Sequence, residues 1–116
     1  MPVVCDFTEI IGDNPVNITS AVLERNFNTG GRHSSAAFLI FNVRGITSTS
    51  VPVKVNNRVV GNIFPYPNSN TSHWFTQMIS LSSSQLNNGN NEVQIETPGN
   101  DSFQIKNMVC FFHQNV

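Results

Sequence analysis

The chain carries one tryptophan and one tyrosine, and both lie beside the same polar loop. Tyr66 and Trp74 flank this loop. The residues between them include three hydrogen-bonding side chains, those of Asn68, Asn70 and His73. An aromatic ring can stack on the apolar C–H face of a pyranose, while planar amide and imidazole groups bind its hydroxyls. This combination predicts a sugar-binding surface.

A second polar loop contains Gly30 and Gly31, followed directly by Arg32. The guanidinium of Arg32 offers several donors in a rigid fork, so we include it among the candidate ligand-binding residues. Each candidate also has a purely structural interpretation: Trp74 as a buried strand residue, and Arg32 as part of a solvated loop. Because Phe75 directly follows Trp74, one of these two side chains faces outward on a regular strand.

Residues suited to catalysis or metal binding are sparse. GxSxG, HExxH, P-loop and GxGxxG motifs are all absent from the sequence. The closest grouping of carboxylates is Asp6, Glu9 and Asp13, which is too loosely spaced to define a metal site, although it leaves a structural calcium open. We therefore expect a non-catalytic protein without a cofactor. A small hydrolase, in which a histidine and a carboxylate meet only in the folded chain, is the remaining enzymatic alternative.

The composition indicates an all-β domain. The chain has 13 Val and 9 Ile against 4 Leu and 3 Ala, and β-branched side chains favour strands whereas Leu and Ala favour helices. Asn, Ser and Thr account for 37 of the 116 residues and are typical of turns and long loops. Hydrophobic residues make up 39% of the chain, enough for a core. The length is that of one domain, residues 1–116.

The low charge excludes some partners. Six Lys plus Arg against seven Asp plus Glu give a formal net charge of -1, so we expect no basic face for nucleic acid. No apolar run approaches the roughly 18 residues of a membrane span, so we expect no membrane partner. The first residues show no secretory signal, which slightly favours a cytoplasmic location.

Alternating or continuous runs of β-branched and aromatic residues predict about seven to nine antiparallel strands. The predicted strands are 3–7, 17–24, 36–43, 51–55, 58–63, 73–81, 92–97 and 102–113, a spacing typical of a β-sandwich. The run 36–43 is the most apolar and is predicted to be a central strand buried on both faces. Asn56 and Asn57 predict a two-residue hairpin turn, because Asn tolerates positive φ. Pro52 lacks an N–H donor, which suits an edge strand or a strand start.

The segment 53–95 carries a pattern shared with a known fold family. A hairpin leads through an aromatic-rich loop to a Trp-bearing strand, and then to Leu86, Gly89 and Asn91 ahead of another strand. This pattern resembles the galactose-binding-domain-like jelly rolls, the β-sandwich family that includes many carbohydrate-binding modules. The resemblance implies a short helical turn near 82–88. We expect Leu86 to plug the end of the sandwich, Gly89 to take a positive φ and an Asn side chain to tie the turn to the backbone.

The two cysteines, Cys5 and Cys110, lie near opposite ends of the chain. The first and last strands of many β-sandwiches are neighbours, so a disulfide between them is geometrically conceivable. The favoured interpretation is two free thiols that behave as small apolar side chains.

Together these patterns predict a single β-sandwich of jelly-roll type that acts as a lectin-like, non-catalytic binding module for carbohydrate. Affinity at one shallow site would be weak, so a homo-oligomer or a parent multidomain protein would supply avidity. The alternative function is that of a structural or assembly subunit, such as an accessory piece of a phage tail, capsid or toxin particle, with no small-molecule ligand.

Overall fold

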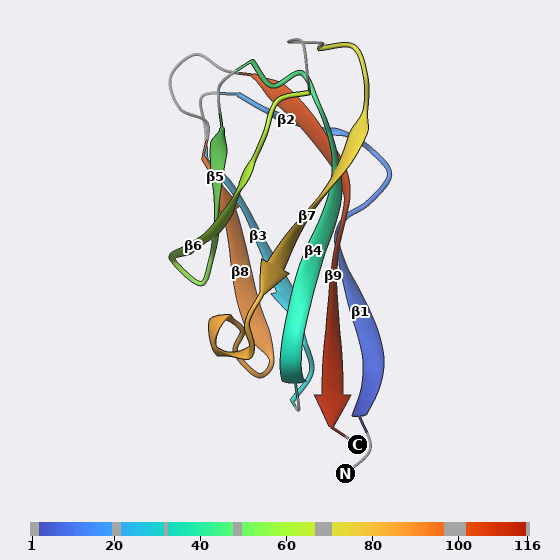
Figure 1. Ribbon diagram of the computed structural model, residues 1–116, viewed down its shortest axis with the longest axis vertical. Coiled ribbons are helices and arrows are strands. Elements are labelled where there is room, and N and C mark those ends of the chain that lie inside the picture. The colour runs from blue at the N-terminus through green and yellow to red at the C-terminus, as the bar shows by residue number, and fades with distance from the viewer. Residues whose placement is uncertain are drawn as a thin grey trace.

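The chain folds into two antiparallel sheets that face each other (Figure 1). The computed structural model describes residues 3–19, 22–31, 33–47, 50–66, 71–96 and 102–115. Within these ranges the elements are β1 (Val3–Ile11), β2 (Val16–Ile18), β3 (Leu23–Asn28), β4 (His33–Arg44), β5 (Val51–Val55), β6 (Arg58–Ile63), β7 (Phe75–Leu81), the 3-10 helix η2 (Ser83–Gln85), β8 (Asn90–Ile95) and β9 (Phe103–Asn115). The described residues include no helix long and apolar enough to cross a membrane.

The two sheets differ in size and in the strands they recruit. A five-stranded sheet has the order β1-β9-β4-β7, with β2 also pairing to β9, and a four-stranded sheet has the order β3-β8-β5-β6. Strands distant in sequence are neighbours in both sheets, as in a jelly roll. The molecule is elongated, with extents of 47 × 23 × 22 Å. The prediction of an all-β sandwich with seven to nine strands is confirmed.

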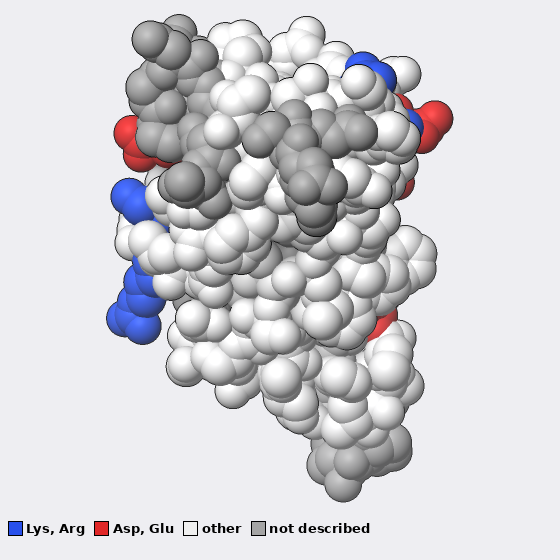
Figure 2. All heavy atoms as spheres, turned by 45° about the horizontal axis from the view of Figure 1, so that its top comes forward, with Lys and Arg blue, Asp and Glu red and all other residues white. Residues whose placement is uncertain are grey.

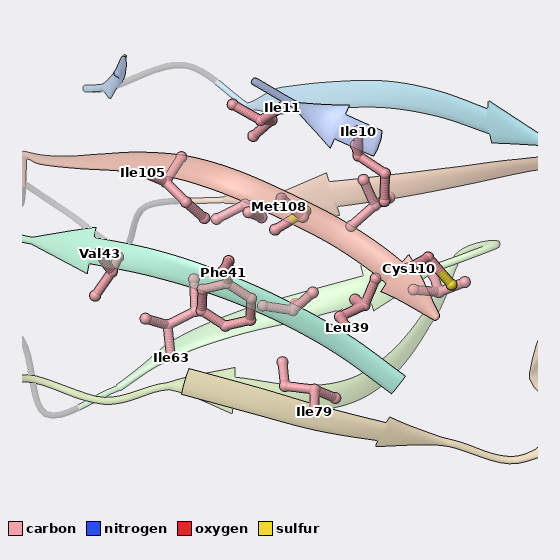
Figure 3. Close-up of a cluster of buried hydrophobic side chains, with 14 of the residues drawn as sticks. Ile10, Ile11, Leu39, Phe41, Val43, Ile63, Ile79, Ile105, Met108 and Cys110 are labelled. Atoms are coloured by element: carbon pink, nitrogen blue, oxygen red, sulfur yellow. The ribbon is translucent and has the colours of Figure 1, made fainter. Parts of the chain in front are cut away.

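The core lies between the sheets and is built by the alternating side chains of each strand (Figure 3). Leu39, Phe41 and Val43 of β4 point inward and are fully buried. They meet inward-facing side chains from neighbouring and facing strands, among them Ile63, Ile79, Ile105, Met108 and Cys110. Because successive residues of a strand point to opposite faces, this inward set fixes which residues occupy the outer surface.

The outer face of β4 corrects one prediction. The strand is central, between β9 and β7, but it is not buried on both faces. Its even-numbered residues, such as Phe38 and Ile40, lie on the outer side and are only half-buried. The apolar run gave no sign of this, because a strand buried on both faces and a strand with an apolar outer face have the same composition.

A second correction concerns residues 17–24, which are not one strand. β2 ends at Ile18 and pairs with β9 in the five-stranded sheet, whereas β3 begins at Leu23 and pairs with β8 in the four-stranded sheet. The predicted polar loop around Gly30 and Gly31 is also shorter than its polar composition suggests, because 26–28 belong to β3 and 33–35 to β4. Polar residues are tolerated there because they pair their backbone with β8 and β9 while their side chains reach the surface.

The hairpin and the turn that mark the family resemblance form as expected. Asn56 and Asn57 both have positive φ, 52° and 69°, and join β5 to β6. Gly89 has φ 80°, and Leu86 is buried at the end of the sandwich. The side chain of Asn91 is buried and bonds the backbone of this turn, accepting from the amide N–H of residue 87 at 2.7 Å.

Pro52 and the cysteines also follow the predictions. Pro52 occupies the start of β5, and pairing of β5 with β8 begins only at Val53, so the missing donor interrupts no β5–β8 bond. Both cysteines are free: Cys5 is exposed and Cys110 is buried. They point to opposite faces of the five-stranded sheet, which explains why neighbouring strands do not bring them together. Burial raises the pKa of the Cys110 thiol to about 12.

Candidate functional site

Two of the predicted ligand-binding residues meet at one end of the sandwich. Tyr66 stacks on His73 with ring centroids 5.6 Å apart and an interplanar angle of 18°. Phe75, the first residue of β7, meets Tyr66 in a T-shaped contact at 5.1 Å. His73 is exposed and Tyr66 is half-buried. His73 and Phe75 therefore cover much of the tyrosine ring, so this cluster leaves little aromatic surface for a ligand.

Trp74 takes a different direction from its neighbour Phe75. Phe75 packs against the core, and Trp74 lies half-buried on the outer face of the five-stranded sheet, as one of the two alternating side chains had to. The Arg44 guanidinium carbon lies 4.6 Å from the centroid of the indole ring. The ammonium nitrogen of Lys106 lies 4.4 Å from it. The structure thus separates Trp74 from Tyr66 and places two cations around it.

Arg32, Asn68 and Asn70 lie outside the residues that the structure describes. Their proposed roles in ligand binding stay predictions. Asn68 and Asn70 lie between Tyr66 and Trp74 in the sequence, whereas the residue after Arg32, His33, begins β4 at the opposite end of that strand from Arg44. The candidate surfaces are therefore defined from described residues alone.

Hydrogen-bonding side chains from β2, β9, β4 and β7 surround Trp74 on the same face. Gln104 accepts hydrogen bonds through Oε1 from the Arg44 guanidinium, with a distance of 3.1 Å from Nε and a second bond from Nη2. The amide of Gln104 in turn donates to Asn17 at 3.0 Å. We call this surface the Trp74 platform; it comprises Asn17, Asn42, Arg44, Trp74, Thr76, Gln104 and Lys106.

Strand alternation explains how the platform forms. Asn42 and Arg44 are outward residues of β4, and they pair in register with Lys106 and Gln104 of β9. On the other side, Asn42 pairs with Thr76 of β7, whose hydroxyl lies 2.6 Å from the Asn42 side-chain oxygen. All of these side chains share a face because registered residues on neighbouring strands point the same way.

Sequence reasoning missed most of this surface. Arg44 lies on one strand, and Gln104 and Lys106 lie on another about 60 residues later, so no local cluster drew attention to them. The signal was present as alternation: polar residues occupy positions 42 and 44 on one strand and 104 and 106 on another. It became interpretable only when the register placed those positions side by side.

The rest of this outer face is apolar. Phe7, Phe111 and Phe38 form a row across β1, β9 and β4, with successive ring centroids 6.0 and 5.2 Å apart. Met78 on β7 is 59% exposed. The outer face therefore has an aromatic half and a polar half centred on Trp74.

The outer face of the four-stranded sheet has a different character. There the amide of Gln94 donates to Glu24 at 3.3 Å and to Glu92 at 2.8 Å, and Lys54 pairs in register with Gln94. Acidic and basic residues are thus mixed on that face, whereas the charged residues of the Trp74 platform, Arg44 and Lys106, are both cations. Figure 2 shows described charged side chains mainly near the margins of the face turned to the viewer, with uncharged surface between them.

The acidic residues near the N-terminus do not converge. Asp6 accepts a hydrogen bond from the Gln114 amide at 2.7 Å, and Glu9 lies on the opposite face of β1. The described residues contain no group of three or more His, Cys, Asp or Glu side chains that could hold a metal. A calcium site stays a prediction. The described residues also enclose no pocket, so both candidate sites are open surfaces.

Comparison with known proteins identifies the fold. No protein-family model and no curated protein matches the sequence. Among solved structures, a family 35 carbohydrate-binding module from Clostridium thermocellum has a TM-score of 0.60 at 14% identity, covering 91% of this chain and 97% of that one. A family 29 carbohydrate-binding module variant complexed with cellulohexaose has a TM-score of 0.59 at 15% identity, covering 90% and 89%.

A third similar structure is part of a large enzyme. The β-porphyranase of glycoside hydrolase family 86 from the human gut bacterium Bacteroides plebeius has a TM-score of 0.65 at 18% identity. The match covers 98% of this chain but only 21% of the enzyme chain. These neighbours confirm the expected jelly-roll β-sandwich of carbohydrate-binding modules.

Proposed function

We propose that this chain is a non-catalytic carbohydrate-binding module that holds its ligand on the Trp74 platform. The observation that carries the proposal is the position of the indole: a half-buried Trp74 on a sheet face, surrounded by amide, hydroxyl and guanidinium groups from several strands. The similarity to modules of families 35 and 29 supports the same class of function.

The platform is suited to this task because its parts are held before a ligand arrives. The two cation–π contacts hold the indole against β4 and β9, and Gln104 fixes the Arg44 fork. A prearranged surface loses little side-chain entropy on binding. The part of the indole that Arg44 and Lys106 leave uncovered would contact the apolar face of a sugar ring, and the amides of Gln104, Asn17 and Asn42 would hydrogen-bond its hydroxyls.

Tyr66 is the alternative aromatic contact. His73 stacks on it and Phe75 meets it in a T-shaped contact, so we assign Tyr66 and His73 a supporting role at the end of the sandwich. The assembly-subunit alternative gains no support from the structural neighbours.

Weak binding at one open surface would gain from attachment to other modules. In the β-porphyranase the similar region is about a fifth of the chain, which supports the idea that this fold serves within larger proteins. We propose that this chain likewise delivers useful affinity through a parent multidomain protein or through self-association, where effective concentration replaces single-site strength.

Affinity electrophoresis and isothermal titration calorimetry against a panel of soluble polysaccharides test the function. We expect binding to at least one polysaccharide, and the variant Trp74→Ala to lower that affinity about 30-fold, the loss of about 2 kcal/mol typical of a central aromatic contact. The matched control Tyr66→Ala removes the other candidate aromatic, and we expect it to change affinity less than threefold.

Three outcomes would contradict the proposal. A folded protein that binds no polysaccharide in the panel would remove its basis, and a larger effect of Tyr66→Ala than of Trp74→Ala would move the site to the end of the sandwich. Release of shorter products from a bound polysaccharide during incubation would contradict the non-catalytic assignment.

A further inference from the structure

We propose that the Trp74 platform selects saccharides bearing a negatively charged group, a carboxylate or a sulfate ester, and that Arg44 and Lys106 recognise this charge. The inference rests on the proposed function, because it takes the platform to be the binding surface. It adds the chemical class of the ligand and two residues that the sequence did not single out.

Two cations contact the same indole ring. Arg44 on β4 and Lys106 on the adjacent β9 occupy diagonal positions, because Arg44 pairs with Gln104 and Lys106 with Asn42. Both charged groups lie within 5 Å of the Trp74 ring centroid, at 4.6 and 4.4 Å. Two strand spacings, of about 4.8 Å each, separate β7 from β9, so the indole and the lysine side chain reach toward each other across β4.

Neither cation has an acidic partner in the described part of the chain. Arg44 bonds the neutral amide oxygen of Gln104 and contacts the indole, and Lys106 contacts the indole. The carboxylate of Glu9 is on the same face, but Glu9 lies on β1 opposite Val109, on the far side of β9 from Arg44. Two like charges near one ring repel each other, so an anion that contacts both of them would be favoured.

The geometry of the guanidinium leaves a binding edge open. Gln104 takes the edge formed by Nε and Nη2, which leaves the outer edge with Nη1 for a ligand. A guanidinium edge matches the two oxygens of a carboxylate or a sulfate ester, and such charge-assisted bonds are about twice as strong as neutral ones. A neutral sugar could use the indole and the amides of the platform but would leave both cations without a counter-charge, as far as the described residues go.

The experiment compares polysaccharides that differ only in charge. Polygalacturonate and its fully methyl-esterified form share a backbone, and the second has lost its carboxylates. Dextran sulfate and dextran make the same comparison for sulfate esters, and polyglutamate supplies charge without any sugar. Calorimetry at about 50 mM and about 500 mM NaCl measures each affinity, because exposed charge interactions weaken as the screening length shortens.

The charge-removing variants are Arg44→Gln and Lys106→Met, which keep much of the length of each side chain. We expect each to lower the affinity for the anionic ligand about tenfold, the effect of losing a hydrogen bond to a charged group. The affinity for the neutral counterpart should fall by a smaller factor, because each variant also removes one of the two cation–π contacts that hold the indole. The matched controls Arg58→Gln and Lys54→Met remove the same charges from the four-stranded sheet, and we expect them to leave binding unchanged. Thermal unfolding confirms that each variant is folded.

Each outcome has a defined meaning. The inference is supported if the protein prefers one anionic polysaccharide over its neutral counterpart and only the Arg44 and Lys106 variants lose this preference. Which of the two pairs shows the preference distinguishes a carboxylate from a sulfate ester. If the neutral and charged forms bind with equal affinity and Trp74→Ala lowers that affinity, the charge selection is overturned and the proposed function stands. Binding of polyglutamate as tight as that of the polysaccharides overturns the saccharide assignment. Insensitivity of glycan binding to Trp74→Ala, Arg44→Gln and Lys106→Met overturns both.

Discussion

The buried side chain of Asn91 holds the turn before β8 in place, and its removal should destabilise the domain strongly. Asn91 is 2% exposed. Its amide nitrogen donates to Thr29 Oγ1 at 3.3 Å and to the carbonyl oxygens of Asn87 and Gly89, both at 3.1 Å. Its oxygen accepts from the Asn87 backbone at 2.7 Å and from the Asn56 side chain at 2.8 Å. One side chain thus joins the residue that follows β3, the β5–β6 hairpin and the turn.

The expected loss follows from these bonds. Asn91→Ala removes all five, at a net contribution of roughly 0.5 to 1.5 kcal/mol each, and leaves the part-buried backbone N–H of Asn87 without its side-chain acceptor. The free energy of unfolding should fall by about 4 kcal/mol, and Tm by about 15 °C for a domain of this length. Urea unfolding at 25 °C measures the first quantity and calorimetry the second.

A control and a second variant make this reasoning refutable. Asn90→Ala changes the exposed neighbour on the same strand and should cost less than about 0.5 kcal/mol. Equal effects of the two alanine variants, or a loss below about 1 kcal/mol for Asn91→Ala, would show that the buried network contributes little.

Asn91→Asp tests the same network through pH. The new carboxyl faces three oxygen atoms in a buried site, which raises its pKa above the ordinary value of about 3.9. The folded state then prefers the protonated acid, so this variant should be most stable below about pH 4. Its stability should fall as pH rises from there toward the raised pKa, relative to the unsubstituted protein. Loss of stability on acidification, compared with that protein, would refute the assignment.

Three further predictions concern the core between the sheets. Gly61→Ala places a Cβ 2.9 Å from Cγ2 of Ile79 on the facing sheet, so it should lower the free energy of unfolding by roughly 1 to 3 kcal/mol. In a double-mutant cycle, Gly61→Ala combined with Ile79→Ala should lose less stability than the sum of the two single losses. The exposed Cys5 should react with a thiol reagent at pH 8 in the folded protein, and Cys110 should react only after unfolding. Because the folded-state pKa of Cys110 is raised to about 12, the contribution of its buried thiol to stability is complete below about pH 9 and is lost as the pH rises toward 12. Comparison of the alkaline unfolding of Cys110→Ala with that of the unsubstituted protein checks this. Phe41→Ala, at a fully buried position, should cost about 3 to 5 kcal/mol in urea unfolding.

Local chemistry was enough for the features that depend on neighbouring residues. Asn56 and Asn57 form the hairpin turn because two adjacent residues there need positive φ, and Gly89 takes its own positive φ for a similar reason. Leu86 and Asn91 act on the turn a few residues away. These features could be inferred because both interacting groups lie within a short stretch of chain.

Long-range pairing explains the features that could not be inferred. The split of 17–24 into β2 and β3 depends on which distant strand each piece pairs with, and nothing in the segment itself records that choice. The apolar outer face of β4 has the same cause: its residues are hydrophobic whether or not another layer covers them. Burial on one side and exposure on the other is a property of the assembled sandwich.

The candidate site combines both kinds of information. Trp74, the chain's single tryptophan, could be proposed from residue type alone, and its outward direction was one of two alternatives that strand alternation allowed. Arg44 and Lys106 are 62 residues apart in the chain, and only the registered pairing of β4 with β9 brings them to one ring. The chemistry of each side chain follows from its residue type alone. Which side chains lie together across strands is decided only when hydrogen bonding and burial select one register.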